Sequence, residues 1–253
     1  MTTTVASANI LFKLGWRDAR TALRQVLEQE PDLVALQEWY PSRLSVLRET
    51  GTVRTVPGLP LPPLLPRRRP PRFHWVASLA CGNVVGARAD RFDLLQARHV
   101  LLSGIGRSDR PDRFLSTEPP RLVTVGVYAD RHADRTVAIL GYHLSPGVEK
   151  AGAYIVSRPL LEARHREEVR RLEALVAELQ RAGHVVYAAG DSNFDLQHLA
   201  GLTSAWAGRE DGPGTIGSRI RKLDDVHGPG PASEVRLVHT PSDHRTVIAV
   251  RPD

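Results

Sequence analysis

Short apolar runs recur along this chain, and they restrict its fold more than any other feature. Each run is bounded by glycine, proline or polar residues, and several are rich in valine, isoleucine or leucine. Runs of this kind are typical of buried β-strands. We therefore expect strands to predominate. The expected strands are 5–12, 33–38, 73–77, 83–87, 94–102, 121–129, 135–142, 185–189, 223–227, 234–239 and 246–250.

Two segments have the apolar spacing of amphipathic helices. The first covers residues 17–30 and should end before Pro31, because the residue before a proline is disfavoured in the α region. The second covers 160–182 and is followed by Gly183, a plausible C-cap. Strands with helices inserted between particular pairs favour a layered α+β sandwich, with two sheets inside and helices outside. No internal repeat is evident, so we expect one domain over residues 1–253.

The charge of the chain favours polyanionic partners. The formal net charge is +6, from 34 Lys and Arg against 28 Asp and Glu, and a basic protein attracts phosphate backbones. A general preference for arginine over lysine is the alternative explanation. Residues 57–72 form a proline-rich basic loop, which is either exposed near a substrate or only a stiff connector. The cations of this and two further basic loops are Arg67, Arg68, Arg69, Arg72, Arg107, Arg110, Arg113, Arg219, Arg221 and Lys222.

The sequence also bears on the cellular compartment. Its single cysteine, Cys81, cannot form an internal disulfide, which favours a reducing interior. The N-terminus lacks the basic start and apolar segment of a signal peptide. No run approaches the ~18 apolar residues of a membrane span. We expect a soluble cytoplasmic protein, and the sequence does not indicate its oligomeric state.

Acidic, amide and imidazole side chains stand where several expected strands end. Glu38, His143 and the pair Asp191 and Asn193 each follow or close an apolar run. Asn9 lies inside the first expected strand, where a buried amide needs a hydrogen-bond partner. Strand ends on a rigid sheet can aim several such groups at one point. Hard oxygen ligands and a positioned water are what metal-assisted phosphoester cleavage requires.

Two further segments combine a carboxylate with a possible histidine partner. Asp243 and His244 precede the last expected strand, and Asp224 comes about twenty residues earlier. A carboxylate that orients a histidine fixes its tautomer and favours its charged form. Each of these signals alone also has an ordinary explanation, such as an Asx-turn at Gly190-Asp191-Ser192-Asn193.

Taken together, the segments resemble the motif series of the endonuclease/exonuclease/phosphatase superfamily. The closest are 31–38, Pro-Asp-Leu-Val-Ala-Leu-Gln-Glu, and 82–85, Gly-Asn-Val-Val, and the resemblance extends from residue 5 to 250. It implies an α+β fold, a four-layer αββα sandwich of two mainly antiparallel sheets flanked by helices, with the site at one rim. The matching motifs are Asn9, Leu36-Gln37-Glu38, Tyr142-His143-Leu144, Gly190-Asp191-Ser192-Asn193, Leu223-Asp224 and Ser242-Asp243-His244.

The resemblance implies a role for each matching residue. Glu38 would be the main ligand of Mg²⁺, for which Mn²⁺ can substitute, with Asn9 beside it and Asp243 contributing. Asp191 would position or deprotonate the attacking water, with support from Asn193.

The remaining implied roles concern the phosphoryl group. His244, oriented by Asp224, would stabilise it or exchange a proton with it, and His143 would be a second imidazole facing it. Arg121 resembles a position near the substrate phosphate. Ser192 departs from the family, which usually has an aromatic residue there, and such a change affects the support of the site more than its chemistry.

Three functions are consistent with these residues. The first is a Mg²⁺-dependent nuclease that hydrolyses DNA or RNA, with Arg67, Arg68, Arg69 and Arg72 contacting the substrate. The second is a phosphatase, or a phosphodiesterase acting on phospholipids or small molecules. The third is an inert binding module, against which stands the presence of every expected ligand and of His244. The sequence does not distinguish DNA from RNA, or endonucleolytic from exonucleolytic cleavage.

Overall fold

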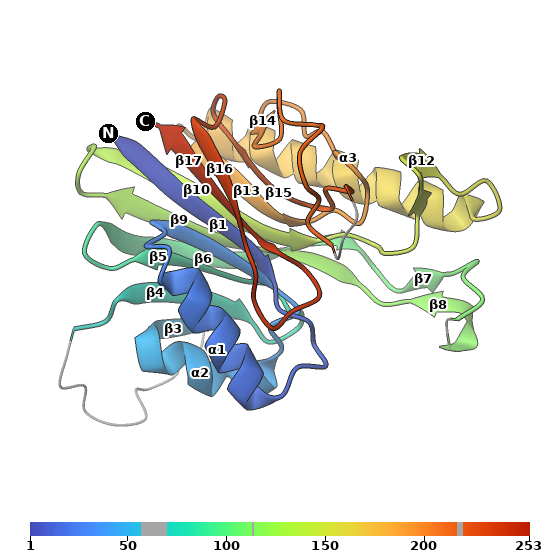
Figure 1. The fold of residues 1–253 in the computed structure, drawn as a ribbon, viewed down its shortest axis with the longest axis horizontal. Helices are drawn as coiled ribbons and strands as arrows, with labels where there is room; N and C mark the ends of the chain where they lie inside the picture. The colour runs from blue at the N-terminus through green and yellow to red at the C-terminus, as the bar shows by residue number, and fades with distance from the viewer. Residues whose placement is uncertain (57–69, 113, 217–219) are drawn as a thin grey trace.

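Two large β-sheets lie face to face in the computed structural model, which describes residues 1–56, 70–112, 114–216 and 220–253 (Figure 1). The strands of the 7-stranded sheet are, in spatial order, β16 (Glu234–Val238), β17 (Thr246–Pro252), β1 (Thr2–Asn9), β2 (Leu33–Gln37), β5 (Val84–Arg88), β4 (Phe73–Ser78) and β3 (Gly51–Val56). Those of the 6-stranded sheet are β14 (Thr203–Ser204), β15 (Asp224–Gly228), β13 (Val185–Asp191), β10 (Arg135–His143), β9 (Arg121–Asp130) and β6 (Phe92–Ser103).

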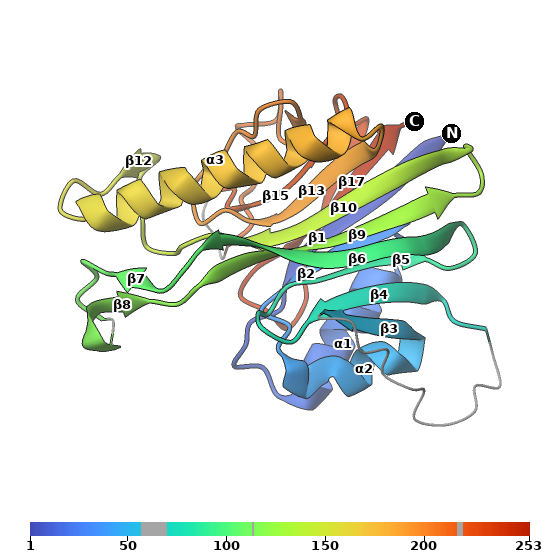
Figure 2. The same ribbon diagram turned by 180° about the vertical axis from the view of Figure 1, so that it is seen from behind.

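Helices cover the outer face of each sheet (Figures 1 and 2). Helices α1 (Trp16–Leu27) and α2 (Leu44–Thr50) pack on the 7-stranded sheet, and α3 (Pro159–Arg181) packs on the 6-stranded sheet. Separate clusters of buried apolar side chains fill the space under α1 and α2, between the sheets, and under α3. Most strand pairs are antiparallel. The predicted four-layer αββα sandwich is therefore confirmed.

Parallel pairing within each sheet brings particular strand ends to one rim. Strand β1 pairs in parallel with β2, which sets Asn9 opposite Gln37. Strand β10 pairs in parallel with β13, which sets His143 opposite Asp191. Strand β15 runs antiparallel to β13 and begins opposite Asp191. The candidate residues of both sheets consequently lie at carboxyl ends of parallel strands, or at the start of an antiparallel neighbour.

Several elements differ from the expected ones. The first strand ends at Asn9 instead of Phe12, so Asn9 closes the strand and does not lie inside it. Helix α1 ends at Leu27, and Glu30 then takes a left-handed conformation with φ 51° before Pro31. The end of α3, by contrast, agrees with the sequence-based expectation, because Gly183 follows the helix with φ 85°, as expected of a C-cap glycine.

Short helices and strands also form in segments for which the sequence predicted neither. The 3-10 helix η1 (Pro41–Arg43) leads into α2, and another, η2 (Phe114–Ser116), lies between β7 (Gly106–Arg107) and β8 (Thr117–Glu118). A second hairpin, β11 (Glu149–Lys150) and β12 (Ala153–Tyr154), precedes α3. Both hairpins project from the same end of the molecule (Figures 1 and 2). Within the described residues, no helix has the length and hydropathy to cross a membrane.

Candidate active site

The amide of Asn9 joins carboxylates from the two sheets. Its Nδ2 donates to Asp191 Oδ2 at 3.0 Å and, more distantly, to Glu38 Oε1 at 3.4 Å. Asn9 and Asp191 are almost completely buried, and burial of a polar group is costly unless it is hydrogen-bonded. The Asn9 Oδ1 atom is also buried, and it has no hydrogen-bond partner among the described residues. The Asn9 side chain therefore binds two acids through its nitrogen and retains an oxygen that could coordinate a cation.

Glu38 directly follows β2 and is held from two directions. Its backbone is left-handed, with φ 58°, a conformation that is uncommon for residues other than glycine and is often found at functional sites. Its Oε2 accepts a hydrogen bond of 2.7 Å from the backbone N–H of Phe12. The carboxylate is thereby fixed at the rim of the 7-stranded sheet, close to the end of β1.

Asp191 and Asn193 form a tight turn after β13. The Asn193 N–H donates to Asp191 Oδ1 at 2.8 Å, and its side-chain amide donates to the carbonyl of Leu144 at 3.1 Å. Asn193 is left-handed, with φ 53°, which asparagine tolerates better than most residues. Burial, and then the nearby charge of Asp224, raises the pKa of Asp191. A carboxylate with a raised pKa is a better proton acceptor.

Asp224 and His244 form a close pair. His244 Nδ1 lies 2.7 Å from Asp224 Oδ2, and because a carboxylate oxygen accepts, Nδ1 carries the proton. Burial alone would lower the pKa of His244, but the Asp224 carboxylate outweighs it and raises this pKa to about 10. His244 is therefore an imidazolium at neutral pH.

His143 has the opposite character. Its Nε2 lies 3.7 Å from Asp191 Oδ2. Burial, together with the nearby cations Arg121 and His244, lowers the pKa of His143 to about 4, although Asp191 opposes this. The two imidazoles of the site thus differ in charge, one neutral and one cationic. Arg121 and His143 also line a cavity of about 130 Å³ together with Glu38.

Asp243 is exposed, and its Oδ1 lies 3.4 Å from Ser242 Oγ. Ser242 Oγ donates to the carbonyl of Asn9 at 2.7 Å and accepts from the N–H of Leu11 at 3.2 Å. This hydroxyl ties the segment before β17 to the end of β1. The structure brings the side chains of Asn9 and Glu38 into direct contact, and Asp243 directly follows Ser242, which binds the Asn9 carbonyl.

The donor set fits a hard divalent cation, which prefers oxygen ligands. Asp191, Asp224 and His244 each offer one ligand atom, and these atoms lie within 4.8 Å of one another. However, the shared hydrogen bond already engages Asp224 with His244. The Glu38 carboxylate and the unpartnered Asn9 oxygen are the better match to such a cation.

The sequence matches no protein-family model and no curated protein. Solved structures do match. An endonuclease/exonuclease/phosphatase family protein from Bacteroides thetaiotaomicron superposes with a TM-score of 0.69, covering 99% of this chain and 94% of that one at 16% identity. This chain has the endonuclease/exonuclease/phosphatase fold.

Other structures with this fold differ in what they bind. TDP2 from D. rerio, complexed with a single-strand DNA product, matches with a TM-score of 0.65 over 100% of this chain and 99% of that one, at 14% identity. A mannosyl-6-phosphatase from Bacteroides thetaiotaomicron VPI-5482 also has a TM-score of 0.65, over 98% of both chains and at 17% identity. The endonuclease/exonuclease/phosphatase fold is therefore compatible with either kind of substrate.

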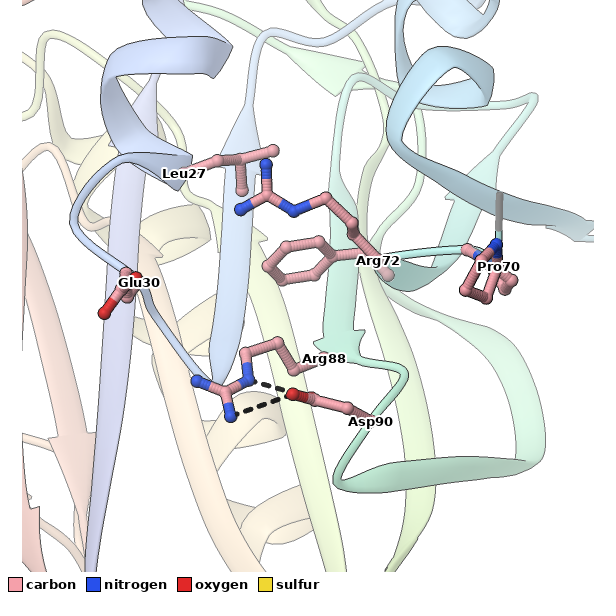
Figure 3. Close-up of a pocket in the computed structure, with 8 residues that line it drawn as sticks. Leu27, Glu30, Pro70, Arg72, Arg88 and Asp90 are labelled. Atoms are coloured by element: carbon pink, nitrogen blue, oxygen red, sulfur yellow. Dashed lines mark hydrogen bonds and ion pairs between the residues drawn. The ribbon is translucent and has the colours of Figure 1, made fainter. Parts of the chain in front are cut away.

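Arg72 does not lie at the candidate site. It immediately precedes β4, whose first residue, Phe73, pairs with Arg88, and the neighbouring Ala87 pairs with Leu33 at the start of β2. Glu38 follows the other end of β2, so the predicted contribution of Arg72 to this site is wrong. It lines a separate cavity of about 470 Å³, where Arg88 pairs with Asp90 (Figure 3). Arg67, Arg68 and Arg69 lie outside the described residues.

Other cations of the expected basic loops have partners within the protein. Lys222 is buried, and its ammonium donates to backbone carbonyls, including that of Gly212 at 2.8 Å. Arg221 forms an ion pair with Glu149. Arg110 pairs with Asp112 at 2.6 Å. These cations primarily stabilise the loops of the endonuclease/exonuclease/phosphatase fold, so their number overstates the charge available to a substrate.

Arg43 is a buried supporting residue that the sequence did not reveal. Its guanidinium reaches the segment between Asn9 and α1 and the residue that follows β2. Arginine is uncommon in interiors, and no pattern in the sequence marks this one. By binding several carbonyls, it fixes the backbone on both sides of the candidate metal ligands. The accepting carbonyls belong to Ile10, Leu11, Phe12, Leu14 and Glu38.

Helix α3 supports the site from behind through two buried polar residues. His165 Nε2 donates to the carbonyl of Ser192 at 2.8 Å, and its Nδ1 accepts from the Tyr154 hydroxyl at 3.0 Å. Glu168, one turn further, accepts from the N–H and the hydroxyl of Ser145 at 2.8 Å each. The helix therefore holds both the turn that carries Asp191 and the segment after His143. His165 and Glu168 are three residues apart, which puts both on one face of the helix. This spacing of two polar residues was the signal in the sequence that could have revealed their supporting role.

Proposed function

We propose that this protein is a Mg²⁺-dependent phosphodiesterase and that its substrate is a nucleic acid. The observation that carries the proposal is the Asn9 amide, which holds Glu38 and Asp191 together beside the pair Asp224 and His244. Oxygen ligands, a proton acceptor and a cationic imidazole at one rim are the groups that hydrolysis of a phosphoester needs. The complex of TDP2, a protein of the same fold, with a single-strand DNA product supports the nucleic-acid assignment.

Glu38 and Asn9 would hold the cation, and Asp243 would contribute from the neighbouring segment. When bound there, Mg²⁺ or Mn²⁺ supplies charge that stabilises the phosphoryl oxygens. Glu38 and Asn9 come from adjacent strands with a fixed register, so the protein needs little rearrangement to present both oxygens.

Asp191 is the proposed proton acceptor. Asn9 and Asn193 orient its two oxygens, and its raised pKa favours uptake of a proton from water. The water oxygen then forms a bond to phosphorus while the bond to the leaving oxygen breaks. His244 donates to the phosphoryl group and offsets its negative charge, since Asp224 keeps this imidazole protonated. His143, neutral, and Arg121 complete the phosphate-facing side.

A substrate panel tests this function. Single-stranded and duplex DNA, RNA and small phosphate esters are incubated with Mg²⁺, with Mn²⁺ and with EDTA. We expect hydrolysis of at least one nucleic acid, its loss in EDTA and its return with either metal. Asp191→Asn and His244→Ala should each lower kcat by about 10²- to 10⁴-fold, while exposed Asp18→Asn should not. Undiminished turnover after chelation would contradict the metal mechanism.

A small-phosphate esterase is the second candidate, and a specific observation favours it. Lys222, Arg221 and Arg110 are engaged within the protein, which weakens the charge argument for a polymer. The structural match to a mannosyl-6-phosphatase is consistent with this function.

Salt dependence distinguishes the two candidates. A nuclease that neutralises several phosphates should bind oligonucleotides much more weakly as salt rises, because counterions are released on binding. Replacing Arg67, Arg68 and Arg69 by serine should reduce that dependence if they contact the backbone. A flat salt response in the unmodified protein would favour the small-phosphate esterase.

A further inference from the structure

Two aromatic side chains lie exposed beside the candidate metal ligands. Phe12 is 54% exposed and Tyr40 is 46% exposed, although large aromatic residues usually bury most of their surface. Their rings lie edge to face, with centroids 6.5 Å apart. The N–H of Phe12 binds Glu38, and Tyr40 follows Glu38 by two residues. Both rings are therefore attached to the backbone that fixes the Glu38 carboxylate.

Tyr40 also forms one wall of the cavity that contains the phosphate-facing residues. Glu38, Arg121 and His143 line the same cavity. The Tyr40 ring stands over Gly82, where an added Cβ would lie 3.3 Å from the ring carbon Cζ. The absence of a side chain at Gly82 thus leaves room for the ring next to the site.

The size and lining of this cavity suit one flat group. Its volume is about 130 Å³, well below the roughly 300–1,000 Å³ of typical ligand pockets. Besides the polar residues, its walls include Cys81, Pro119 and Pro120, which offer apolar surface. A base held in a duplex would first have to be unpaired and unstacked, at a cost in free energy, to reach such a space, whereas an unpaired base can enter without that cost.

We propose that Phe12 and Tyr40 form a subsite for an unpaired nucleobase, adjacent to the phosphodiester that the enzyme cleaves. This inference rests on the proposed function and narrows it to single-stranded nucleic acid. Aromatic faces stack on every base, so the subsite tolerates different sequences. The Lys13 ammonium, 5.7 Å from the centroid of Phe12, adds a cation beside the rings, as suits a polyanionic strand.

The test compares oligothymidylate with an abasic oligomer of the same length and charge. Affinity is measured by fluorescence anisotropy in an Asp191→Asn background, in which cleavage is slowed, and kcat/KM is measured in the active enzyme. The unmodified rings should favour the base-bearing oligomer by about 5- to 150-fold, the range for one stacked base. The double variant Phe12→Ala, Tyr40→Ala should lose that preference, and Tyr40→Phe should keep it. Trp16→Ala is the matched control, because this exposed aromatic is already covered by Arg20 at 3.9 Å.

Each outcome separates the subsite from the proposed function. Equal affinity for both oligomers in the starting protein overturns the subsite, and so does an equal loss for both in the double variant. A base preference in binding without cleavage of any oligomer supports the subsite and overturns the nuclease function. If the double variant instead lowers hydrolysis of a sugar phosphate by a comparable factor, the rings face a sugar and the proposal is wrong.

Discussion

Replacing Asp224 by asparagine should discharge His244 at neutral pH. The pKa of this imidazole is raised from 6.5 to about 10, which corresponds to a preference of about 5 kcal/mol for the charged form at ~1.4 kcal/mol per pKa unit. His244 is only 9% exposed, so solvent screens the pair weakly. Without the Asp224 carboxylate, burial should lower the pKa of His244, although Asp191 and Asp243 still act to raise it. If the pKa returns to the ordinary value of 6.5, roughly a tenth of the molecules carry the charge at about pH 7.5.

The assay is an NMR titration of the His244 imidazole in EDTA, from about pH 5 to pH 11, with the pH–rate profile measured separately. In the Asp224→Asn variant we expect kcat/KM to fall by about 10²- to 10⁴-fold near neutral pH and to recover partly as the pH is lowered. Asp243→Asn is the matched control for the titration, because Asp243 also raises the pKa of His244 but by less. A His244 pKa close to 6.5 in the unmodified protein would refute the reasoning.

The pair also makes stability depend on pH. Because the folded pKa of His244 is raised, its contribution to the free energy of unfolding is complete below pH 6.5 and is lost as the pH rises through about 10.

Three further variants test the supporting structure. Glu38→Gln should weaken Mg²⁺ binding, measured by calorimetry, by at least about tenfold; unchanged affinity would remove Glu38 from the metal site. His165→Ala should lower kcat more than it raises KM, because the turn at Asp191 loses its donor, whereas His165→Gln can still donate and accept and should restore much of kcat. Equal rates for the two variants would assign His165 no positioning role. Arg43→Met should lower the free energy of unfolding in urea by about 3 kcal/mol or more, since several carbonyls lose their donor; a change below about 0.5 kcal/mol would contradict that role.

The strands and their polar ends were predictable because they are local. The expected strand 33–38 ends in an acid, and the structure ends β2 at Gln37 with Glu38 at the rim. The need of Asn9 for a partner was also evident, but not the identity of that partner. Asp191 lies 182 residues away, and only the packing of one sheet on the other brings it near.

The direction in which each strand runs and the burial of individual cations were harder to predict. Arg72 was expected near the site because a basic loop precedes β4, but a strand pattern does not state which end of the strand meets the rim. The pairings from β1 to β4, one parallel and then two antiparallel, set the direction of β4 and put Arg72 at the end opposite Glu38. Arg43 and Lys222 resemble surface cations in the sequence, and only the carbonyls arranged around them show that they are structural.

The pairing of β1 with β17 means that the site is completed by residues from opposite ends of the sequence. Ser242, before β17, bonds to the carbonyl of Asn9, and Asp224 and His244 also come from the last part of the chain. During synthesis, α1 and β2 can associate with β1 early, but the His244 imidazole reaches Asp191 only after β17 has emerged from the ribosome. Domains also acquire such long-range strand pairs slowly. A nascent chain that lacks β17 therefore cannot yet hold His244 in its place between Asp224 and Asp191.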